Sequence, residues 1–385
     1  MHPLFAQLPV SIFEHMSGLA RAHDAVNLGQ GFPDFGWPDD VVRHAAGALT
    51  GEASQYPPMR GKPELREAVA EHYRARQGLE IAPDQVIITS GATEALAASL
   101  MALISPGDEV LLFQPLYDAY RPLVLRAGGV PRLAGLKPPG WRIDAELIAG
   151  AFSDRTRLVV FNNPHNPTAR VFDTDELALL AKACVRHDVI ALSDEVWEHV
   201  LFDRRRHIPL SSLPGMAERT VKVGSAGKIF SLTGWKVGWA VTTPELAAAV
   251  ANVHQFLTFT TAPNLQSAVA YGLGKGEDYY TDMRARFAEA RDHLAAGLEA
   301  VGFHVLPAEG TYFLNVDLAA SGIATDDVDF CERAVRECGV AAIPLSALYA
   351  ESPVTNVIRL CFAKRRETLD EGIARLAEAR KLMGA

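Results

Sequence analysis

The stretch SAGKIFSLTGWKVGW, residues 225–239, decides how this chain is interpreted, because it places a lysine on a turn of small residues directly after a strand-like run. That lysine, Lys228, is one of nine lysines among 37 basic residues, so the chain strongly prefers arginine elsewhere. A lysine amine forms a Schiff base with an aldehyde, whereas a guanidinium does not. Lys228 is therefore either a reactive amine or an exposed turn lysine, and the residues around it favour the reactive amine.

Composition excludes several classes of protein. The chain has 385 residues, of which 49% are hydrophobic, enough for a large core and about two or three domains. A net charge of -9 argues against partnership with nucleic acid or an anionic membrane, because both attract clustered positive charge. Four cysteines without a Cys-x-x-Cys pair indicate neither a metal site nor disulfides, and no apolar run is long enough to cross a bilayer. We therefore expect a cytoplasmic protein without metal.

Short apolar runs that end in Gly, Pro, Asn or Ser alternate with helical patterns. Runs that are apolar throughout are typical of a sheet whose faces are both covered by helices. We therefore predict an α/β fold, with a mainly parallel sheet sandwiched by helices in a large domain and a smaller α+β domain. Ligands bind at the carboxyl edge of such a sheet. The predicted strands are residues 86–89, 109–113, 158–161, 189–192, 220–223 and 237–241.

The order of patterns also predicts domains. Asp173, followed three residues later by Glu176, is a capping signal for a helix that runs to about His187. Residues 277–300 form one long, charged, alanine-rich helical pattern, after which short strands and helices mix. We predict an N-terminal arm at 1–45 that contributes to the small domain, a large domain at 46–276 and a small domain at 277–385.

Several residues around Lys228 suit a phosphate. Ala92 and Thr93 begin a predicted helix, where free backbone N–H groups and the positive end of the helix dipole attract anions. Ser225 and Lys236 flank Lys228 and could converge on the same anion. Neighbouring positive charge would lower the pKa of Lys228 and so favour its nucleophilic form. Taken alone, the helix start is also an ordinary cap, and Lys236 is also a solvated strand-edge charge.

Three further polar residues follow or interrupt strands. Asp194 ends a buried strand and needs a cationic partner, such as the protonated nitrogen of a pyridine ring, unless it is a loop or cap residue. Asn166 lies in a loop with two Asn-Pro pairs, and its amide can donate to a ring oxygen or a carboxylate. Arg359, between apolar neighbours, is either a surface charge on an edge strand or a buried fork for a carboxylate.

With these residues placed, the chain resembles a class I/II aminotransferase, an enzyme of fold type I that depends on pyridoxal 5′-phosphate. The nearest resemblance is to the branch of kynurenine/glutamine and methionine aminotransferases. It covers nearly the whole chain in the family's order. The motifs that carry it are NLGQGFPDF (27–35), QYPPMRG (55–61), NPHNP (163–167), SDEV (193–196), SAGKIFSLTGWKVGW (225–239), GTYF (310–313) and IRLCF (358–362).

The resemblance implies a role for each matching residue. Lys228 would carry the cofactor through a Schiff base, Asp194 would pair with the pyridine nitrogen, and Asn166 would approach the ring oxygen and the substrate carboxylate. Arg359 would bind the α-carboxylate near the Gly31 backbone. The remaining implied cofactor contacts are Ala92, Thr93, Ser225 and Lys236 on the phosphate, Tyr117 stacked on the ring, and Tyr56 on the phosphate of the partner subunit's site. The last contact implies a homodimer with shared active sites.

One position departs from the family's pattern. The family usually has a tyrosine directly after Asp-Glu-Val, and its hydroxyl bonds the ring oxygen, but this chain has Trp197. An indole N–H donates with a different reach and has no acidic proton. We therefore expect the ring oxygen to be less stabilised, with Trp197 still beside the cofactor.

The implied reaction is a transamination in two half-reactions with ping-pong kinetics, in which Lys228 moves the proton at Cα. A cysteine-S-conjugate β-lyase needs the same Cα proton removal and is the alternative within this cofactor class. A non-enzymatic regulator on this fold is the alternative outside it, and the short, non-basic N-terminus leaves no room for its DNA-binding segment.

The substrate is less constrained than the chemistry. Phe13, Phe256, Phe259, Tyr120 and Tyr312 either line an apolar pocket for methionine, glutamine, an aromatic amino acid or kynurenine, or belong to the core. No second arginine is evident for a dicarboxylic side chain, which argues against aspartate, while succinyldiaminopimelate stays open as a substrate.

Overall fold

A computed structural model describes the chain except for residues 1–3, 5, 7, 53 and 385, so the very start of the predicted arm lies outside the described residues. A seven-stranded sheet with the strand order β2-β8-β7-β6-β5-β3-β4 forms the centre of the fold. Its strands are β2 (Val86–Thr89), β3 (Glu109–Gln114), β4 (Val130–Gly135), β5 (Thr156–Asn162), β6 (Ile190–Asp194), β7 (Thr220–Ser225) and β8 (Gly238–Val241).

The sheet is mainly parallel, as predicted. Strands β4, β3, β5, β6 and β7 are parallel neighbours, and β8 pairs antiparallel with both β7 and β2. Every residue of β2, β3, β7 and β8 is buried, so both faces of these strands are covered. The pairing sets Asn162 beside Asp194 and Asp194 beside Val223. The carboxyl ends of β5, β6 and β7 therefore meet at one edge.

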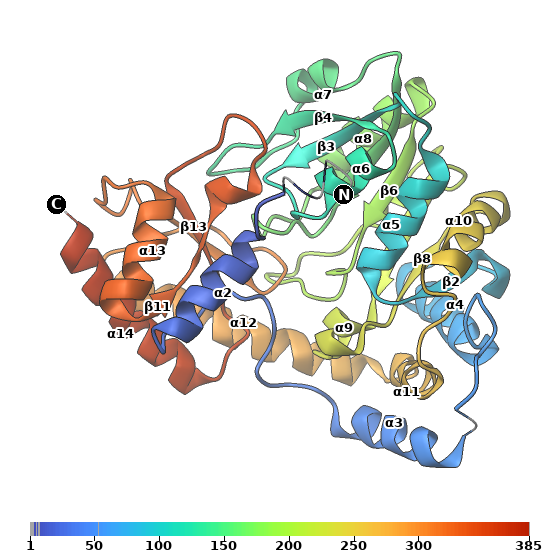
Figure 1. Ribbon diagram of the computed structural model, residues 1–385, viewed down its shortest axis with the longest axis horizontal. Coiled ribbons are helices and arrows are strands. Elements are labelled where there is room, and N and C mark those ends of the chain that lie inside the picture. Colours follow the sequence, from blue (N-terminus) through green and yellow to red (C-terminus); the bar gives the residue numbers. More distant parts are fainter. Residues whose placement is uncertain (1–3, 5, 7, 53, 385) are drawn as a thin grey trace.

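Helices surround this sheet (Figure 1). α5 packs against β6, β7 and β8, and α4 and α10 pack against β2. The capping box predicted for Asp173 and Glu176 is present at the start of α8. The helices between residues 39 and 273 are α3 (Asp39–Gly51), α4 (Pro63–Gln77), α5 (Ala92–Leu103), α6 (Tyr120–Arg126), α7 (Ala145–Ala151), α8 (Thr174–Arg186), α9 (Ala226–Ile229), α10 (Pro244–Leu257) and α11 (Pro263–Leu273).

A second, four-stranded antiparallel sheet lies in the C-terminal part, with the order β12-β13-β10-β9. The long helix predicted at 277–300 is present as α12. The elements of this part are α12 (Glu277–Ala300), β9 (His304–Val305), β10 (Phe313–Asp317), α13 (Asp327–Cys338), β11 (Val340–Ala341), β12 (Ile343–Pro344), β13 (Val357–Cys361) and α14 (Arg366–Met383).

The N-terminal segment runs alongside this second sheet. α2 (Ile12–Ala22) packs against α13, and β1 (Val26–Asn27) pairs in parallel with β11. In Figure 1 the blue segment passes from α2 beneath α9 to α3, which packs against α11. This path between the two parts of the chain agrees with the predicted N-terminal arm. The domain boundaries at residues 45 and 276 stay a prediction. No helix among the described residues is long and apolar enough to span a membrane.

Strand β4 was absent from the prediction. Its sequence, VPRLAG, is interrupted by Pro131 and Arg132, so it lacks the continuous apolar run that identified the other strands. β4 is an edge strand with exposed and half-buried positions. An edge strand tolerates proline because one side of it makes no ladder hydrogen bonds.

Candidate active site

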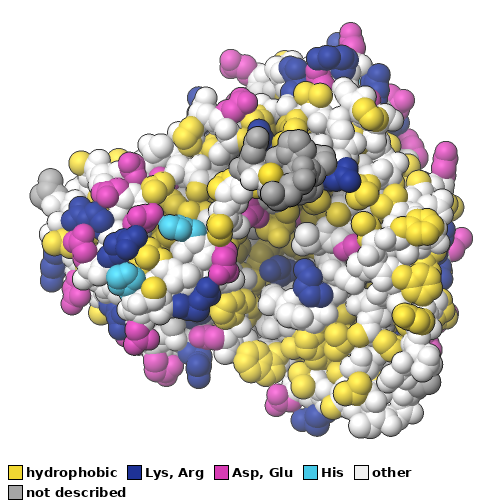
Figure 2. Space-filling view, viewed as in Figure 1, with side chains coloured by type: hydrophobic (Ala, Val, Ile, Leu, Met, Phe, Trp, Pro, Cys, Tyr) yellow, Lys and Arg dark blue, Asp and Glu magenta, His cyan; other side chains and the backbone are white. Residues whose placement is uncertain are grey.

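A cavity of about 420 Å³ lies at the carboxyl edge of the seven-stranded sheet. Figure 2 shows a hollow near the middle of the molecule, with Lys or Arg and hydrophobic side chains around it. The structure brings together every predicted site residue there except Tyr56. Those that line the cavity are Gly31, Ala92, Thr93, Tyr117, Asn166, Asp194, Trp197, Ser225, Lys228, Lys236 and Arg359.

Lys228 projects from the short helix α9, which begins directly at the end of β7. Burial is the main reason that the pKa of its amine falls to about 8, and the positive charges of Lys236 and Arg359 lower it further. The prediction named charge as the cause, but desolvation is the larger one. A pKa near 8 leaves a useful fraction of the amine neutral near neutral pH, as a nucleophile requires.

Asp194 ends β6 with its carboxylate buried in the cavity wall. The Tyr120 hydroxyl donates to Oδ2 at 2.6 Å, and burial raises the pKa of the carboxyl. Among the described residues no Lys, Arg or His forms an ion pair with Asp194, so the expected cationic partner is not a side chain of the described chain. The carboxylate therefore faces a cavity in which a protonated ring nitrogen would find a counterion.

An anion cradle lies at the start of α5. Gly91 precedes the helix with φ +78°, a conformation that favours glycine, and the first-turn amides of Ala92 and Thr93 have no acceptor within the helix. A Cβ atom on Gly91 would lie 3.1 Å from Cε and 3.2 Å from Nζ of Lys236. Lys236 therefore reaches the same helix end from the other side, and Ser225 lies at the N-cap of α9. Amides, a hydroxyl and an ammonium together suit a phosphate.

Arg359 is buried on β13, between β10 and β12, which decides between the two interpretations of this residue in favour of a buried fork. Nη1 donates to Oδ1 of Asn166 at 2.8 Å, and Nη2 donates to the Gly29 carbonyl at 3.1 Å. The Cζ atom of its guanidinium lies 3.8 Å from the centroid of the Phe313 ring. Among the described residues no carboxylate pairs with Arg359, and its Nε has no hydrogen-bond partner. Burial lowers the pKa of the guanidinium to about 10, and it remains charged near neutral pH.

Asn166 is positioned by its own loop. Its backbone N–H donates to Oδ1 of Asn162 at 2.7 Å, and Nδ2 of Asn162 donates to the Asp194 carbonyl at 2.8 Å. The carbonyl oxygen of the Asn166 side chain accepts from Arg359, so the amide group is oriented by that contact. Asn162 therefore connects the end of β6 to the loop that carries Asn166.

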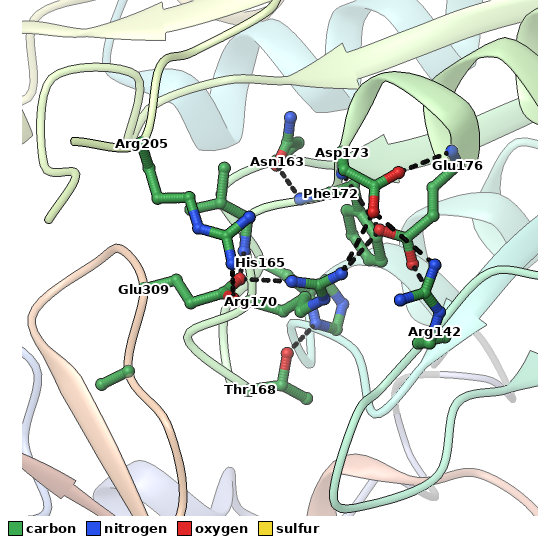
Figure 3. A network of polar contacts seen from close by, with 12 residues as sticks. Arg142, Asn163, His165, Thr168, Arg170, Phe172, Asp173, Glu176, Arg205 and Glu309 are labelled. Atoms are coloured by element: carbon green, nitrogen blue, oxygen red, sulfur yellow. Dashed lines mark hydrogen bonds and ion pairs between the residues drawn. The ribbon is translucent and has the colours of Figure 1, made fainter. Parts of the chain in front are cut away.

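The far end of this loop is braced by ion pairs (Figure 3). Arg170 lies between two carboxylates, with Nη1 2.6 Å from Glu309 and Nη2 2.7 Å from Glu176. Arg205 also pairs with Glu309. Because Glu309 comes directly before the segment GTYF, these pairs fasten the Asn166 loop to the chain that enters β10.

The remaining predicted residues are placed as follows. Tyr117 lies in the cavity wall with its ring against Tyr120, and Trp197 is buried beneath Lys228, whose Nζ lies 4.7 Å from the indole centroid. Tyr56 is 83% exposed and lies against Phe259, away from this chain's cavity. Whether Tyr56 serves a partner's site stays a prediction.

The predicted apolar pocket needs correction. Phe13 and Tyr120 line the cavity, but Phe256 is 85% exposed, and Phe259 lies beside Tyr56 on the surface. Tyr120 is also not simply apolar lining, because it donates to Asp194. A sequence shows that a tyrosine is near a site but not which atom its hydroxyl meets. Asn162, directly before the Asn-Pro loop, was missed for the same reason.

The chain is similar in sequence and in fold to proteins of known function. Methionine aminotransferase of Escherichia coli (strain K12) is 41% identical over 97% of this chain and 96% of its own length. Kynurenine–oxoglutarate transaminase 1 of Homo sapiens is 36% identical over 91% of each chain. The solved structure of N-succinyldiaminopimelate aminotransferase from Mycobacterium tuberculosis has a TM-score of 0.95 and 41% identity, and the match covers 98% of this chain and all of that one.

The fold, the site and these relatives together define the class of protein: an amino-acid aminotransferase of fold type I. Residues 23–376 match one family over most of the chain. The chain belongs to that family, Aminotransferase class I and II, whose members generally depend on pyridoxal phosphate. The resemblance on which the predictions drew is thereby confirmed.

Proposed function

We propose that this enzyme moves the α-amino group of methionine, glutamine, an aromatic amino acid or a kynurenine-like amino acid to a 2-oxo acid, with pyridoxal 5′-phosphate as its cofactor. The relatives named for methionine and kynurenine support this range of donors. The cavity supports it too, because its only cationic side chains among the described lining residues are Lys228, Lys236 and Arg359. Each of these has another role, so none of them is left for an acidic substrate side chain. Succinyldiaminopimelate is the alternative donor, because a relative named for it is 41% identical.

The residues present fit the proposed cofactor. Lys228 would bind its aldehyde, Asp194 would pair with the ring nitrogen, and the cradle of Ala92, Thr93, Ser225 and Lys236 would hold the phosphate. Tyr117 and Trp197 would border the ring. The chemistry that pyridoxal phosphate supplies is an electron-withdrawing ring, which stabilises negative charge at the Cα of an attached amino acid.

The chain's own side chains would bind the substrate and move the proton. Arg359 would bind the substrate carboxylate and thereby orient the Cα–H bond toward Lys228. The Lys228 amine, neutral once it is free, would take the proton from Cα and return a proton in the same half-reaction. Asp194, ionised beside a cation, would keep that cation protonated.

The single observation that carries the proposal is a pair of cations in one cavity, the half-buried Lys228 and the buried Arg359. Lys228 has a pKa near 8, and Arg359 lacks a carboxylate among the described residues. A buried guanidinium without a counterion is costly, so its retention indicates an anionic ligand.

Borohydride trapping tests the cofactor. The protein is incubated with pyridoxal phosphate, reduced with borohydride and digested, and the peptides are mapped by mass spectrometry. We expect the tag on Lys228. A tag on another lysine, or none, would contradict the proposal. Steady-state kinetics add the reaction class: parallel double-reciprocal lines indicate transamination, whereas pyruvate and ammonia released from a cysteine conjugate without an oxo acid indicate the β-lyase.

Arg359→Met tests the carboxylate site. We expect KM for the amino acid to rise about 30-fold or more, because a buried charge-assisted pair contributes about 2–5 kcal/mol. The measurement is KM for an amino acid and also the dissociation constant of a carboxylic acid inhibitor such as a 3-arylpropionate. A matched control is Arg380→Met, in an arginine of α14 that bonds the Ser321 carbonyl far from the cavity. Unchanged inhibitor affinity in Arg359→Met would count against the assignment.

We further propose a cytoplasmic homodimer with shared active sites. The four cysteines are free thiols, as expected in a reducing compartment. The exposed rings of Tyr56 and Phe256, at 83% and 85%, are apolar surface that a second copy would cover. Sedimentation equilibrium tests the assembly, since a dimer has twice the chain mass of 41.7 kDa.

A further inference from the structure

The hydroxyl of Tyr312 lies between the Lys228 amine and the backbone carbonyl of Gly31. It donates to the Gly31 carbonyl at 2.6 Å and accepts from Nζ of Lys228 at 3.1 Å. A phenol has one proton. Because that proton is directed to Gly31, the oxygen faces Lys228 as an acceptor, and the lysine must be the donor.

We propose that Tyr312 is a positioning residue for Lys228: its phenol oxygen holds one N–H of the amine, so that the lone pair of the neutral amine is directed elsewhere, into the cavity. The inference rests on the proposed function, in which that lone pair takes the proton from Cα. It goes beyond the roles that the family resemblance implied, which included none for the motif GTYF.

Trp197 cannot orient the Lys228 amine in this way, because an indole does not accept a hydrogen bond. The indole lies face-on to Lys228 at 4.7 Å, and Tyr312 meets Trp197 edge-on, with ring centroids 4.3 Å apart and an interplanar angle of 90°. The amine is therefore bordered by two rings, but an indole offers no lone pair that accepts a hydrogen bond. Among the described residues, Tyr312 is the one side chain whose hydrogen bond to Nζ is present. Tyr312 therefore orients the Lys228 amine through a hydrogen bond, whereas Trp197 only packs against it.

The charged and titratable groups that act on Lys228 come from several elements. Asp194 ends β6, Lys236 precedes β8, and Arg359 and Cys361 both lie on β13. Burial holds the pKa of the Tyr312 phenol well above its usual value, so it stays protonated at the pH values where Lys228 titrates. The donation to Gly31, and with it the acceptor role toward Lys228, persists across that range.

The hydroxyl can be removed without loosening the chain around it. Gly310 N–H donates to the Ala169 carbonyl at 3.0 Å, and Thr311 N–H donates to the Val200 carbonyl at 2.9 Å. The Tyr312 carbonyl accepts from Phe362 N–H at 3.0 Å. These backbone bonds, with the ring contacts to Trp197, stay in place in Tyr312→Phe, and we expect this variant to fold.

The test compares Tyr312→Phe with a matched control. Tyr349→Phe also removes one tyrosine hydroxyl that bonds a backbone carbonyl, that of Leu136 at 2.9 Å, but away from Lys228. The first readout uses protein without cofactor: Lys228 is acetylated with brief pulses of acetic anhydride from pH 6 to 10 and its peptide is quantified by mass spectrometry. We expect the midpoint to fall by about one pH unit in Tyr312→Phe, because the ammonium loses an acceptor.

The second readout is the division between kcat and KM in the loaded enzyme. We expect kcat to fall about 10- to 100-fold, since the amine loses its direction, while KM for the amino acid changes less than about twofold. In Tyr312→Phe more of the Lys228 amine is neutral, so a purely electrostatic role of Tyr312 would predict a kcat that is unchanged or higher. A lower kcat therefore indicates lost orientation of the amine. Tyr349→Phe should match the wild type in both readouts.

Two outcomes would overturn the proposal. An unchanged acetylation midpoint in Tyr312→Phe would show that the contact with Lys228 does not matter. A raised KM with unchanged kcat would show that Tyr312 only holds Gly31. Failure of the proposed function is a separate result, because it would appear in the wild type as a Lys228 that borohydride and pyridoxal phosphate do not tag, while the acetylation profile would still be measurable.

Discussion

Replacing Lys228 with alanine should lower kcat for transamination by at least about 10⁴-fold, because in the proposed mechanism the amine both binds the cofactor's aldehyde and moves the Cα proton. Lys228→Arg should be equally inactive, since a guanidinium keeps the charge but forms no imine. The rate constant of each half-reaction, followed by absorbance with one substrate at a time, measures this loss of activity. Both variants should still bind pyridoxal phosphate, because the cradle at the start of α5 is unchanged.

The control is Lys275→Ala, which removes a lysine that pairs with Asp40 outside the cavity. It should keep wild-type kcat and the wild-type borohydride tag. If Lys228→Ala kept more than about one per cent of the activity, or if its peptides carried a reduced cofactor on another lysine, Lys228 would not be the residue that performs the chemistry.

Much of the fold could be predicted because buried parallel strands have a simple sequence signature. The strands next to the site are mostly apolar runs, and polar residues lie at or just beyond their carboxyl ends, which the sheet brings to one edge. Asp194 at the end of β6 and Lys228 beyond β7 are examples. Edge strand β4 lacks that signature because it is only half covered. Burial on both faces, rather than strand formation as such, is what the pattern detects.

The site was predictable as a set of residues but not as a set of contacts. The sequence left Arg359 open between surface and interior, and the order β12-β13-β10 decides it, since a central strand has no exposed edge. The hydroxyls of Tyr120 and Tyr312 are a similar case. Their partners, Asp194, Lys228 and Gly31, are far away in the chain, so only tertiary packing determines where each proton is directed.

The contacts of Lys222 in the core could likewise not be predicted from the sequence. In the sequence it is the one residue that breaks the apolar run of β7, yet its side chain is 2% exposed. Its ammonium pairs with Glu195 and lies 2.7 Å from Glu198, and the Tyr73 ring lies 4.7 Å away. Because Glu195 directly follows Asp194, this buried ion cluster supports the end of β6 from the side opposite the cavity.

Lys222→Met should lower the free energy of unfolding by about 3–5 kcal/mol, because it removes the cation that two buried carboxylates share. Urea unfolding at pH 7 measures the loss. Arg21→Met, which breaks the exposed pair with Glu14, should cost less than about 1 kcal/mol. Adding Glu198→Gln to Lys222→Met should recover part of the loss, whereas an additive double variant would mean that the two residues do not interact.

The pH dependence of that loss identifies its cause. Burial alone would raise the pKa of the Glu195 carboxyl, but Lys222 and His207 lower it from 4.5 to about 2. A carboxyl with a lowered folded pKa contributes stability above pH 4.5 that disappears as the pH falls toward 2. The wild type therefore loses this contribution in acid, while Lys222→Met lacks the part that Lys222 supplies and keeps the contact of His207 with Glu195. The difference in unfolding free energy between them should narrow from pH 4.5 downward, and a difference that stays constant would indicate lost packing of the lysine stem instead of lost charge.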